Sequence, residues 1–277
     1  MQIVSKDTIF TNVCETSDGG IFWEGLENEI DTKNLKFIDW KGQEWNIDSK
    51  TKSSHPNSRF CSPITNCPIL NDDWDNPRGV AISAIIFGGR RPYGIPLVFQ
   101  SKDWTHGVLV GSCVKSETTS AASDLKANTV LHDPFSMRPF VGYNCGDYMK
   151  HWLEMGEKPG RHIPLIFHVN WFLKDESGNF VWPGFGENSR VLEWILDRCR
   201  GVENYVESPI GLLPKKESFN LENLPGVDFA RLFHIDKDFW VKELAECRNF
   251  FENVINEEFP KQLDDALKAV ERAVEMM

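Results

Sequence analysis

Apolar and polar residues alternate over short stretches in the first part of the chain. Residues 8–13 alternate, and after the Asp18-Gly19-Gly20 turn a second apolar stretch begins at residues 21–23. Successive side chains of a strand point to opposite faces, so alternation is typical of a strand with one buried face. We expect residues 8–13 and 21–23 to pair as a β-hairpin, and residues 35–45 to form another short strand pair.

A nearly continuous apolar stretch covers residues 80–87. This pattern is typical of a central strand that is covered on both faces of its sheet. Shorter apolar stretches at residues 97–99, 107–111 and 165–169 predict further strands. The chain is therefore expected to build a larger sheet after residue 80.

Helical spacing of apolar residues dominates the second half of the chain. These residues recur every three or four positions in residues 144–155, 191–196, 238–256 and 263–274, which places them on one face of a helix. Ser189 stands just before the second of these segments and is a candidate N-cap. Strands and helices in this succession predict an α/β protein.

Composition and charge narrow the class of protein. The 277 residues carry a formal net charge of −11, which argues against a general nucleic-acid binder because such proteins present a basic surface. The seven cysteines match no zinc-binding spacing, so we expect reduced thiols in an intracellular protein. No apolar stretch approaches the length of a membrane span, and no targeting signal is visible in the sequence. We expect a cytoplasmic protein, with a mitochondrial location left open.

Two loops carry residues that are suited to anionic ligands. Gly88-Gly89-Arg90-Arg91 directly follows the apolar stretch at residues 80–87, and loops after buried strands often hold ligands. Arginine donates paired hydrogen bonds to phosphate, so this loop is a candidate phosphate contact; the alternative is plain surface charge. Asn57 and Arg59 lie in an irregular stretch at residues 50–68, which is either a ligand-binding loop or a solvated surface loop.

An aromatic stretch and a polar stretch complete the candidates. The aromatic stretch carries six rings, together with two glycines and a proline: Phe167, Trp171, Phe172, Phe180, Trp182 and Phe185. Flat rings beside a glycine bend suit a planar ligand such as a nucleobase, and the alternative is core packing. The polar stretch, residues 115–127, is either a linker or a mobile lid that orders over a ligand.

Four blocks of sequence occur together in a recognisable order: His55-Pro56-Asn57-Ser58-Arg59-Phe60, Phe87-Gly88-Gly89-Arg90-Arg91-Pro92, Asp133-Pro134-Phe135-Ser136-Met137-Arg138-Pro139-Phe140, and Phe167-His168-Val169-Asn170-Trp171-Phe172 with Trp182-Pro183-Gly184-Phe185-Gly186-Glu187-Asn188-Ser189-Arg190. In order and spacing the chain resembles GTP-dependent phosphoenolpyruvate carboxykinases. The resemblance implies an α/β fold: the mixed β-sheet nucleotide-binding domain of this family, with C-terminal helices. Residues 1–277 are expected to be the C-terminal portion of the enzyme, with that domain incomplete at its N-terminal side.

The family converts oxaloacetate and GTP into phosphoenolpyruvate, GDP and CO2 in gluconeogenesis. The resemblance implies that Asn57 and Arg59 bind oxaloacetate or phosphoenolpyruvate, that Arg90 contacts the phosphates of GTP, and that Arg59 and Arg90 are catalytic. It also implies a wall for GTP made of Trp171, Phe172, Phe180, Phe185, Gly186, Glu187 and Asn188. The stretch at residues 115–127 is similar to the family's mobile lid, with Lys115 in place of an arginine at its base. The family further implies a monomer.

Two departures from the family concern the groups that hold phosphate and metal. A phosphate-binding loop of the Walker type needs Gly-Lys followed by Ser or Thr, and this chain contains no Gly-Lys dipeptide and no local His/Asp cluster. We therefore expect the Mn²⁺ ligands to lie in a missing N-terminal part, and this chain alone to be inactive. The alternative is a truncated, non-catalytic remnant that binds a guanine nucleotide or a partner.

Overall fold

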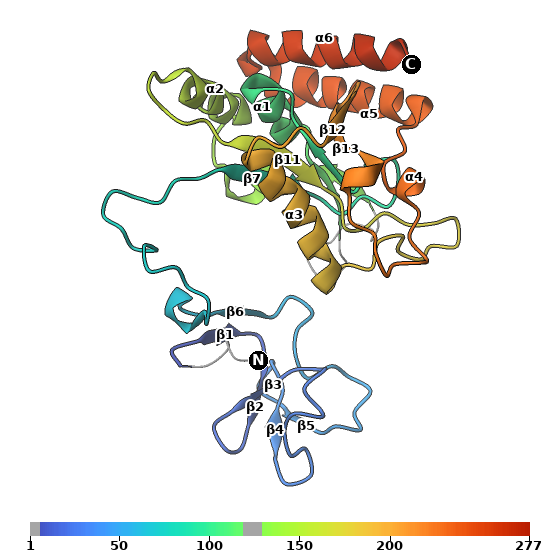
Figure 1. Ribbon diagram of the computed structural model, residues 1–277. Helices are drawn as coiled ribbons and strands as arrows, with labels where there is room; N and C mark the ends of the chain where they lie inside the picture. Colours follow the sequence, from blue (N-terminus) through green and yellow to red (C-terminus); the bar gives the residue numbers. More distant parts are fainter. Residues whose placement is uncertain (1–5, 119–128) are drawn as a thin grey trace. The chain divides into compact units, whose positions relative to one another are not determined.

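The computed structural model describes residues 6–118 and 129–277, and the chain forms two compact units (Figure 1). Of the described residues, 6–80 make up the first unit, and 81–118 with 129–277 make up the second. Within the described residues, every helix is too short or too polar to cross a membrane.

The first unit is built from short antiparallel strands. β2 (Cys14–Thr16) pairs with β3 (Ile21–Phe22) and β4 (Phe37–Ile38), and β4 pairs with β5 (Glu44–Trp45). The hairpin thus exists, but the prediction that residues 8–13 form its first strand is wrong. A small core lies between the strands, with Phe22 and Phe37 packed edge to face at 5.2 Å.

The strand predicted at residues 8–13 has a distant partner instead. β1 (Ile9–Thr11) pairs with β6 (Arg59–Cys61), which brings Thr11 opposite Arg59. A single turn of 3-10 helix follows at Ile64–Asn66. The residues around Arg59 are therefore partly strand rather than a continuous irregular loop.

The second unit contains a mixed, five-stranded sheet in the order β12-β13-β8-β11-β7. These strands are Tyr205–Ser208, Gly211–Pro214, Val98–Gln100, Leu165–Val169 and Ala84–Gly88. β11 runs parallel to β7 and antiparallel to β8. The expected mixed α/β fold is confirmed.

β7 departs from the prediction in its place within the sheet. The apolar stretch at residues 80–87 predicts a central strand, but β7 is the last strand in the order of the described residues. Val80 and Ile82 precede the strand and are each 62% exposed. The prediction is wrong because an apolar run alone does not reveal how many neighbours a strand has.

Helices cover both faces of this sheet (Figure 1). Adjacent residues of β11 point to opposite faces: Ile166 packs closely against Gly107 of α1 (Trp104–Ser112), and Phe167 packs edge to face against Trp194 of α3 (Asn188–Cys199) at 5.8 Å. The remaining helices are α2 (Cys145–Glu157), α4 (Phe229–Leu232), α5 (Lys237–Phe250, continued by a π turn at Phe251–Ile255) and α6 (Lys261–Glu275).

Two local predictions about helices are wrong. Residues 107–111 form part of α1 rather than a strand, and Asp103 caps the helix by accepting a hydrogen bond from the backbone N–H of His106 at 2.8 Å. α3 begins at Asn188, so Ser189 lies inside its first turn, where its hydroxyl donates to the Gly186 carbonyl at 2.7 Å. The predictions of α2, α5 and α6 are confirmed.

The segment expected to form a lid is described only at its start. Lys115–Glu117 forms β9, which pairs with β10 (Val130–His132). Residues 119–127 of the predicted lid lie outside the described residues. The base of the segment is a short strand rather than a linker.

Candidate functional site

Two parallel strands of the main sheet end side by side. The last residue of β7, Gly88, is paired with the last residue of β11, Val169. Parallel neighbours place their carboxyl ends at one edge of a sheet, where open α/β sheets usually hold ligands. The segments that begin at Gly89 and at Asn170 therefore leave the sheet as neighbours.

Asn170 joins these two segments. Its buried side-chain amide donates hydrogen bonds to the backbone carbonyls of Arg91 and Ile95 at 2.9 and 3.0 Å. Its side-chain oxygen accepts hydrogen bonds from the backbone N–H groups of Arg91 and Phe172 at 3.3 and 3.2 Å. Because an amide has two donor hydrogens and two acceptor lone pairs, this side chain is fully satisfied and fixes the arginine loop against the aromatic stretch.

The glycine of the arginine loop permits a close approach to β9. A Cβ atom on Gly89 would collide with the backbone carbonyl of Lys115. The next residue, Arg90, receives a hydrogen bond from the backbone N–H of Glu117 at 2.9 Å, and its own N–H donates to Ser116 at 3.1 Å. The Gly-Gly pair of the sequence thus lets the loop run along β9.

Arg90 and Arg91 have different environments although they are adjacent in sequence. Arg90 is partly exposed, and its guanidinium donates two hydrogen bonds to the Glu117 carbonyl at 2.9 and 2.6 Å. Arg91 is only 6% exposed and donates two hydrogen bonds to the carboxylate of Glu243 at 2.6 and 2.7 Å. Of the two arginines, only Arg90 is therefore accessible to a ligand, while Arg91 is buried in an ion pair.

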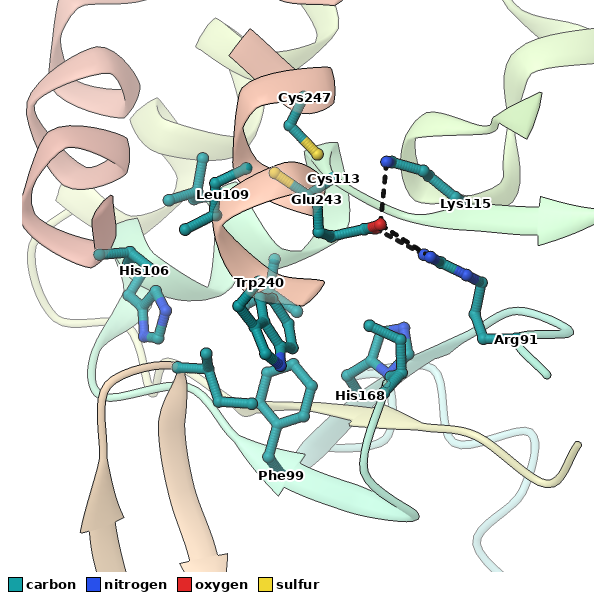
Figure 2. Close-up of a pocket in the computed structure, with 15 residues that line it drawn as sticks. Arg91, Phe99, His106, Leu109, Cys113, Lys115, His168, Trp240, Glu243 and Cys247 are labelled. Atoms are coloured by element: carbon teal, nitrogen blue, oxygen red, sulfur yellow. Dashed lines mark hydrogen bonds and ion pairs between the residues drawn. The ribbon is translucent and has the colours of Figure 1, made fainter. Parts of the chain in front are cut away.

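Glu243 forms ion pairs with two cationic side chains (Figure 2). Besides Arg91, the ammonium of buried Lys115 lies 3.1 Å from its carboxylate and 2.7 Å from that of Glu246. Burial tends to raise the pKa of Glu243, but the hydrogen bonds and charge of Arg91 and the charge of Lys115 outweigh burial and lower the pKa below its ordinary value. Glu243 is therefore ionised at neutral pH and holds α5 to the base of the loop.

His168 is a neutral neighbour of this ion-pair cluster. Its ring stacks on Phe99 with centroids 5.2 Å apart. Burial lowers the pKa of His168 to about 4, and the positive charge of Arg91 adds to that effect. The imidazole is therefore uncharged at neutral pH and serves here as a packing residue.

The six rings of the aromatic stretch divide into three groups by their exposure to solvent. Phe167 and Trp182 are buried in the core, as the packing alternative predicted. Phe180 and Phe185 are 59% and 94% exposed, and Trp171 and Phe172 are half-buried. Because most of their ring surface is open to solvent, Phe180 and Phe185 are the members most available to a ligand.

A small hairpin presents Phe180. The backbone N–H of Asp175 donates to Asn179, and Lys174 pairs with Phe180 as an isolated bridge. The Phe180 ring lies 6.0 Å from that of Phe172 in an edge-to-face arrangement, and the Lys174 ammonium lies 5.5 Å from its centroid. Beside this hairpin lies a cleft of about 570 Å³ that Leu173 and Lys174 help to line.

Asn188 is oriented by the core. Its side-chain oxygen accepts a hydrogen bond of 2.8 Å from the indole N–H of Trp182. Glu187, one residue earlier, forms an ion pair with Arg190, and the carbonyl of Gly186 accepts from Ser189. Local hydrogen bonds thus hold in place the residues at the start of α3 that are expected to line the GTP site, namely Gly186, Glu187 and Asn188.

The two residues expected to bind substrate lie together in the first unit. The guanidinium Nε of Arg59 donates to the side-chain oxygen of Asn57 at 3.1 Å. Asn57 is in turn tied to His55, whose ring nitrogen accepts the Asn57 backbone N–H at 2.9 Å. Arg59 is exposed on β6, so its remaining donors are accessible to an anionic ligand.

Manganese, which the resemblance implies, has no ligand set in the described part of the chain. Residues 6–118 and 129–277 contain no group of three or more His, Cys, Asp or Glu side chains arranged to hold a metal ion. The described residues therefore do not fit this cofactor.

Comparison with known proteins identifies the family. The family model described as the phosphoenolpyruvate carboxykinase C-terminal P-loop domain matches residues 1–273. The chain belongs to the GTP-dependent phosphoenolpyruvate carboxykinase family. It is 47% identical over 277 residues to the cytosolic enzyme of Bos taurus, 49% identical over 270 residues to the enzyme of Ascaris suum, and 48% identical over 277 residues to the mitochondrial enzyme of Homo sapiens.

The match covers the chain far more fully than it covers these phosphoenolpyruvate carboxykinases. It takes in 100%, 97% and 100% of this chain, but 44%, 42% and 43% of the three relatives in the same order. The chain thus spans less than half the length of the curated relatives.

Sequence reasoning did not select Asn170 or Glu243 as site residues. Glu243 carries a signal, because it lies three residues after Trp240 and four before Cys247 on the apolar face of α5. A carboxylate on such a face needs a buried cation. Asn170 is harder to recognise from the sequence, because the only feature that distinguishes it is that it is a polar residue directly after the apolar strand β11.

Proposed function

We propose that this chain supplies the guanine-nucleotide side of a GTP-dependent phosphoenolpyruvate carboxykinase. The whole reaction decarboxylates oxaloacetate and transfers the γ-phosphoryl group of GTP to give phosphoenolpyruvate, GDP and CO2. The observation that carries the proposal is the junction at the sheet edge, where Asn170 fixes the Arg90 loop beside the stretch that bears the exposed rings. Phosphates need cations and a base needs a flat apolar surface, and this edge offers both.

The nucleotide roles follow from exposure and chemistry. Arg90 is the cation of the loop that reaches solvent and would contact the phosphates. The base would stack on the exposed rings of Phe180 and Phe185, and the half-buried rings of Trp171 and Phe172 would complete the wall for GTP. Gly186, Glu187 and Asn188 would line the polar edge of the base, and the hydrogen bond from Trp182 fixes the amide of Asn188 for that task.

The substrate roles fall to the first unit. The exposed guanidinium of Arg59, steadied by Asn57, suits the carboxylate of oxaloacetate or phosphoenolpyruvate. Decarboxylation leaves an enolate, which must be stabilised by positive charge until it takes the phosphoryl group. Arg59 and Arg90 are proposed as catalytic in this sense, and residues 115–127 are proposed as the lid that keeps water from the enolate.

The phosphate-binding loop and the metal ligands are not among the groups that this chain is proposed to supply. The sequence has no Gly-Lys dipeptide, and the described residues offer no ligand set for Mn²⁺. A divalent metal would shield the phosphates during transfer, but no step is assigned to residues of this chain through it. By itself the chain is expected to bind guanine nucleotide without forming phosphoenolpyruvate.

The oligomeric state and the cellular location of the chain are also proposed. We propose that the chain acts as a monomer in the cytoplasm and has no nucleic-acid partner, which its net charge of −11 supports. The relatives include both cytosolic and mitochondrial enzymes by name, so a mitochondrial location is the alternative. Light scattering of the purified chain tests the monomer directly.

Two assays on the purified chain test the function. Its thermal unfolding is recorded with GDP, with ADP and without nucleotide, because a ligand that binds the folded state raises the midpoint. Phosphoenolpyruvate formation is then measured with oxaloacetate, GTP and Mn²⁺. We expect stabilisation by GDP, little by ADP, and no turnover. Equal stabilisation by both nucleotides, or by neither, would overturn the guanine site, and measured turnover would overturn the division of roles.

A further inference from the structure

Two cysteines from distant parts of the chain meet inside the second unit. Cys113 is the C-cap residue of α1, and Cys247 lies in the last turn of α5. Both are free thiols, and each lies against the other closely enough to affect its ionisation. Figure 2 shows their sulfur atoms pointing toward one another. The proposed nucleotide site does not use either thiol.

Both thiols line the same small cavity. Its volume is about 50 Å³, and a water-sized molecule needs roughly 10–15 Å³ measured in this way. The cavity therefore admits a molecule of a few heavy atoms and excludes a peptide-sized one.

Buried polar side chains make this cavity suitable for a small polar molecule. The side chains of Arg91, His168 and Trp240 line it and are each at least nine-tenths buried. Within residues 6–118 and 129–277, the Nε of Arg91, the Nδ1 of His168 and the Nε1 of Trp240 have no hydrogen-bond partner. The N–H groups of Arg91 and Trp240 are donors, which a small molecule with oxygen acceptors would satisfy, and the His168 nitrogen donates or accepts according to its tautomer.

Lys115 and Glu243 line the cavity together with both thiols. Burial lowers the pKa of Lys115, but the neighbouring Cys247 and Glu243 outweigh burial and raise it. The neighbouring Cys247 and burial raise the pKa of Cys113 well above its ordinary value. Cys113 is therefore the thiol that stays protonated, which leaves Cys247 as the thiol that attacks first.

We propose that Cys113 and Cys247 are a modification site, which hydrogen peroxide admitted to this cavity converts into a reversible disulfide. The thiolate of Cys247 attacks one peroxide oxygen and breaks the O–O bond, giving a sulfenic acid and hydroxide, which takes up the proton that Cys247 released and becomes water. The sulfur of Cys113 then attacks the sulfenic sulfur, and the proton of Cys113 leaves with the displaced hydroxide as a second water. Two thiols and one peroxide give one disulfide and two waters.

The disulfide would tie the end of α1 to α5. Glu243, which holds Arg91 and Lys115, lies one helical turn before Cys247 on the same face of α5. Intracellular disulfides of mesophiles are usually transient rather than structural, so a thiol reductant should reverse the bond. The oxidised chain should unfold at a higher temperature, because the link closes a long loop in the unfolded state.

The test uses the purified chain and graded hydrogen peroxide, followed by blocking of free thiols with N-ethylmaleimide, digestion and mass spectrometry. We expect one Cys113–Cys247 cross-linked peptide, its loss after dithiothreitol, and a product lighter by two hydrogen atoms. Oxidised glutathione should form it at least tenfold more slowly, because the cavity excludes it. Both thiols still free, oxidation to sulfinic acid without the cross-link, or equal rates with the two oxidants would overturn the proposal.

Matched variants locate the reaction. Cys113→Ser and Cys247→Ser should each abolish the two-hydrogen loss, while Cys199→Ser, which removes another partly buried thiol, should leave it unchanged. Formation of an equivalent disulfide in both of the first two variants would contradict the assignment. If either variant fails to fold, peptide mapping of the unaltered chain still decides the question.

Discussion

The buried indole of Trp182 donates a hydrogen bond to the side-chain oxygen of Asn188 at 2.8 Å. This contact links the core of the second unit to the first residue of α3, where the proposed base site has its polar edge. A side chain that the core orients can discriminate between bases, whereas a freely rotating amide can donate to or accept from either. Four expectations follow from this and similar contacts.

Trp182→Phe removes the indole donor and keeps an aromatic ring. We expect the preference for GTP over ATP to fall about fivefold, since one hydrogen bond is worth roughly 1 kcal/mol. The matched control is Trp194→Phe, because the indole of Trp194 also donates inside the core, to the Asn204 carbonyl at 3.1 Å. Competition titrations with both nucleotides give the ratio. An equal loss of preference in the two variants would point to a general effect on folding.

Arg90→Ala and Arg91→Ala should affect different properties of the chain, GTP binding in the first case and stability in the second. Arg90→Ala is expected to weaken GTP binding at least tenfold with little change in the free energy of unfolding, because its partner is a backbone carbonyl near the surface. Arg91→Ala leaves Glu243 with one buried cation fewer and should lower the free energy of unfolding by about 3 kcal/mol. Urea unfolding and GTP titration of both variants separate the two roles.

An exposed ion pair calibrates the Arg91 result. Arg231 pairs with Glu176, whose side chain is 90% exposed, so Arg231→Ala should destabilise the chain far less than Arg91→Ala. If Arg91→Ala is no more destabilising than Arg231→Ala, the buried ion pair does not hold α5 as described.

Phe185→Ala tests whether an exposed ring serves a ligand. The ring is 94% exposed, so its removal should change the free energy of unfolding by less than about 0.5 kcal/mol. GTP binding should weaken by roughly 1–3 kcal/mol, the range for one base stacked on one aromatic ring. Phe140→Ala, at a ring that is 77% exposed elsewhere, is the control and should leave GTP binding unchanged.

Acid should destabilise the chain through its buried histidines. Burial lowers the pKa of His168 and of His106 from 6.5 to about 4. Between these values the unfolded chain binds protons that the folded chain excludes, so the free energy of unfolding falls as pH decreases from 6.5 toward 4. Each histidine contributes roughly 1 kcal/mol per pH unit in that window, and nothing above it.

A variant isolates the histidine contribution from that of the carboxylates. His168→Gln should flatten the pH dependence between pH 6.5 and 4, the window set by the lowered pKa of His168, relative to the unaltered chain. His234→Gln, at an exposed histidine, should not change it. Denaturant unfolding at several pH values gives the slopes, and parallel slopes for His168→Gln and the unaltered chain would contradict the role of burial.

Periodicity predicted the secondary structure best where one face of an element is exposed. α5 and α6, which each bury one face, follow their apolar stripes. The prediction of a strand at residues 107–111 is wrong because a short segment that is buried on all sides has no period that distinguishes a helix from a strand. The signal that would have decided it lies outside the segment, in the capping side chain of Asp103.

The site was predictable in its parts but not in its connections. The Arg90 loop and the aromatic stretch carry local signals that the sequence shows. The difference between Arg90 and Arg91 depends on Glu243, 152 residues after Arg91, and no local pattern reveals such a partner. The same holds for Asn170, whose four hydrogen bonds to three residues become visible only when β7 and β11 are paired.

Calorimetric titration of the purified chain with GTP and with ATP tests the central claim most directly. If the edge beside Gly88 and Val169 is a guanine-nucleotide site, GTP binds with a dissociation constant at least tenfold below that of ATP, and Phe185→Ala weakens GTP binding without lowering stability. Equal affinity for GTP and ATP, or GTP binding that Phe185→Ala leaves unchanged, would contradict the account.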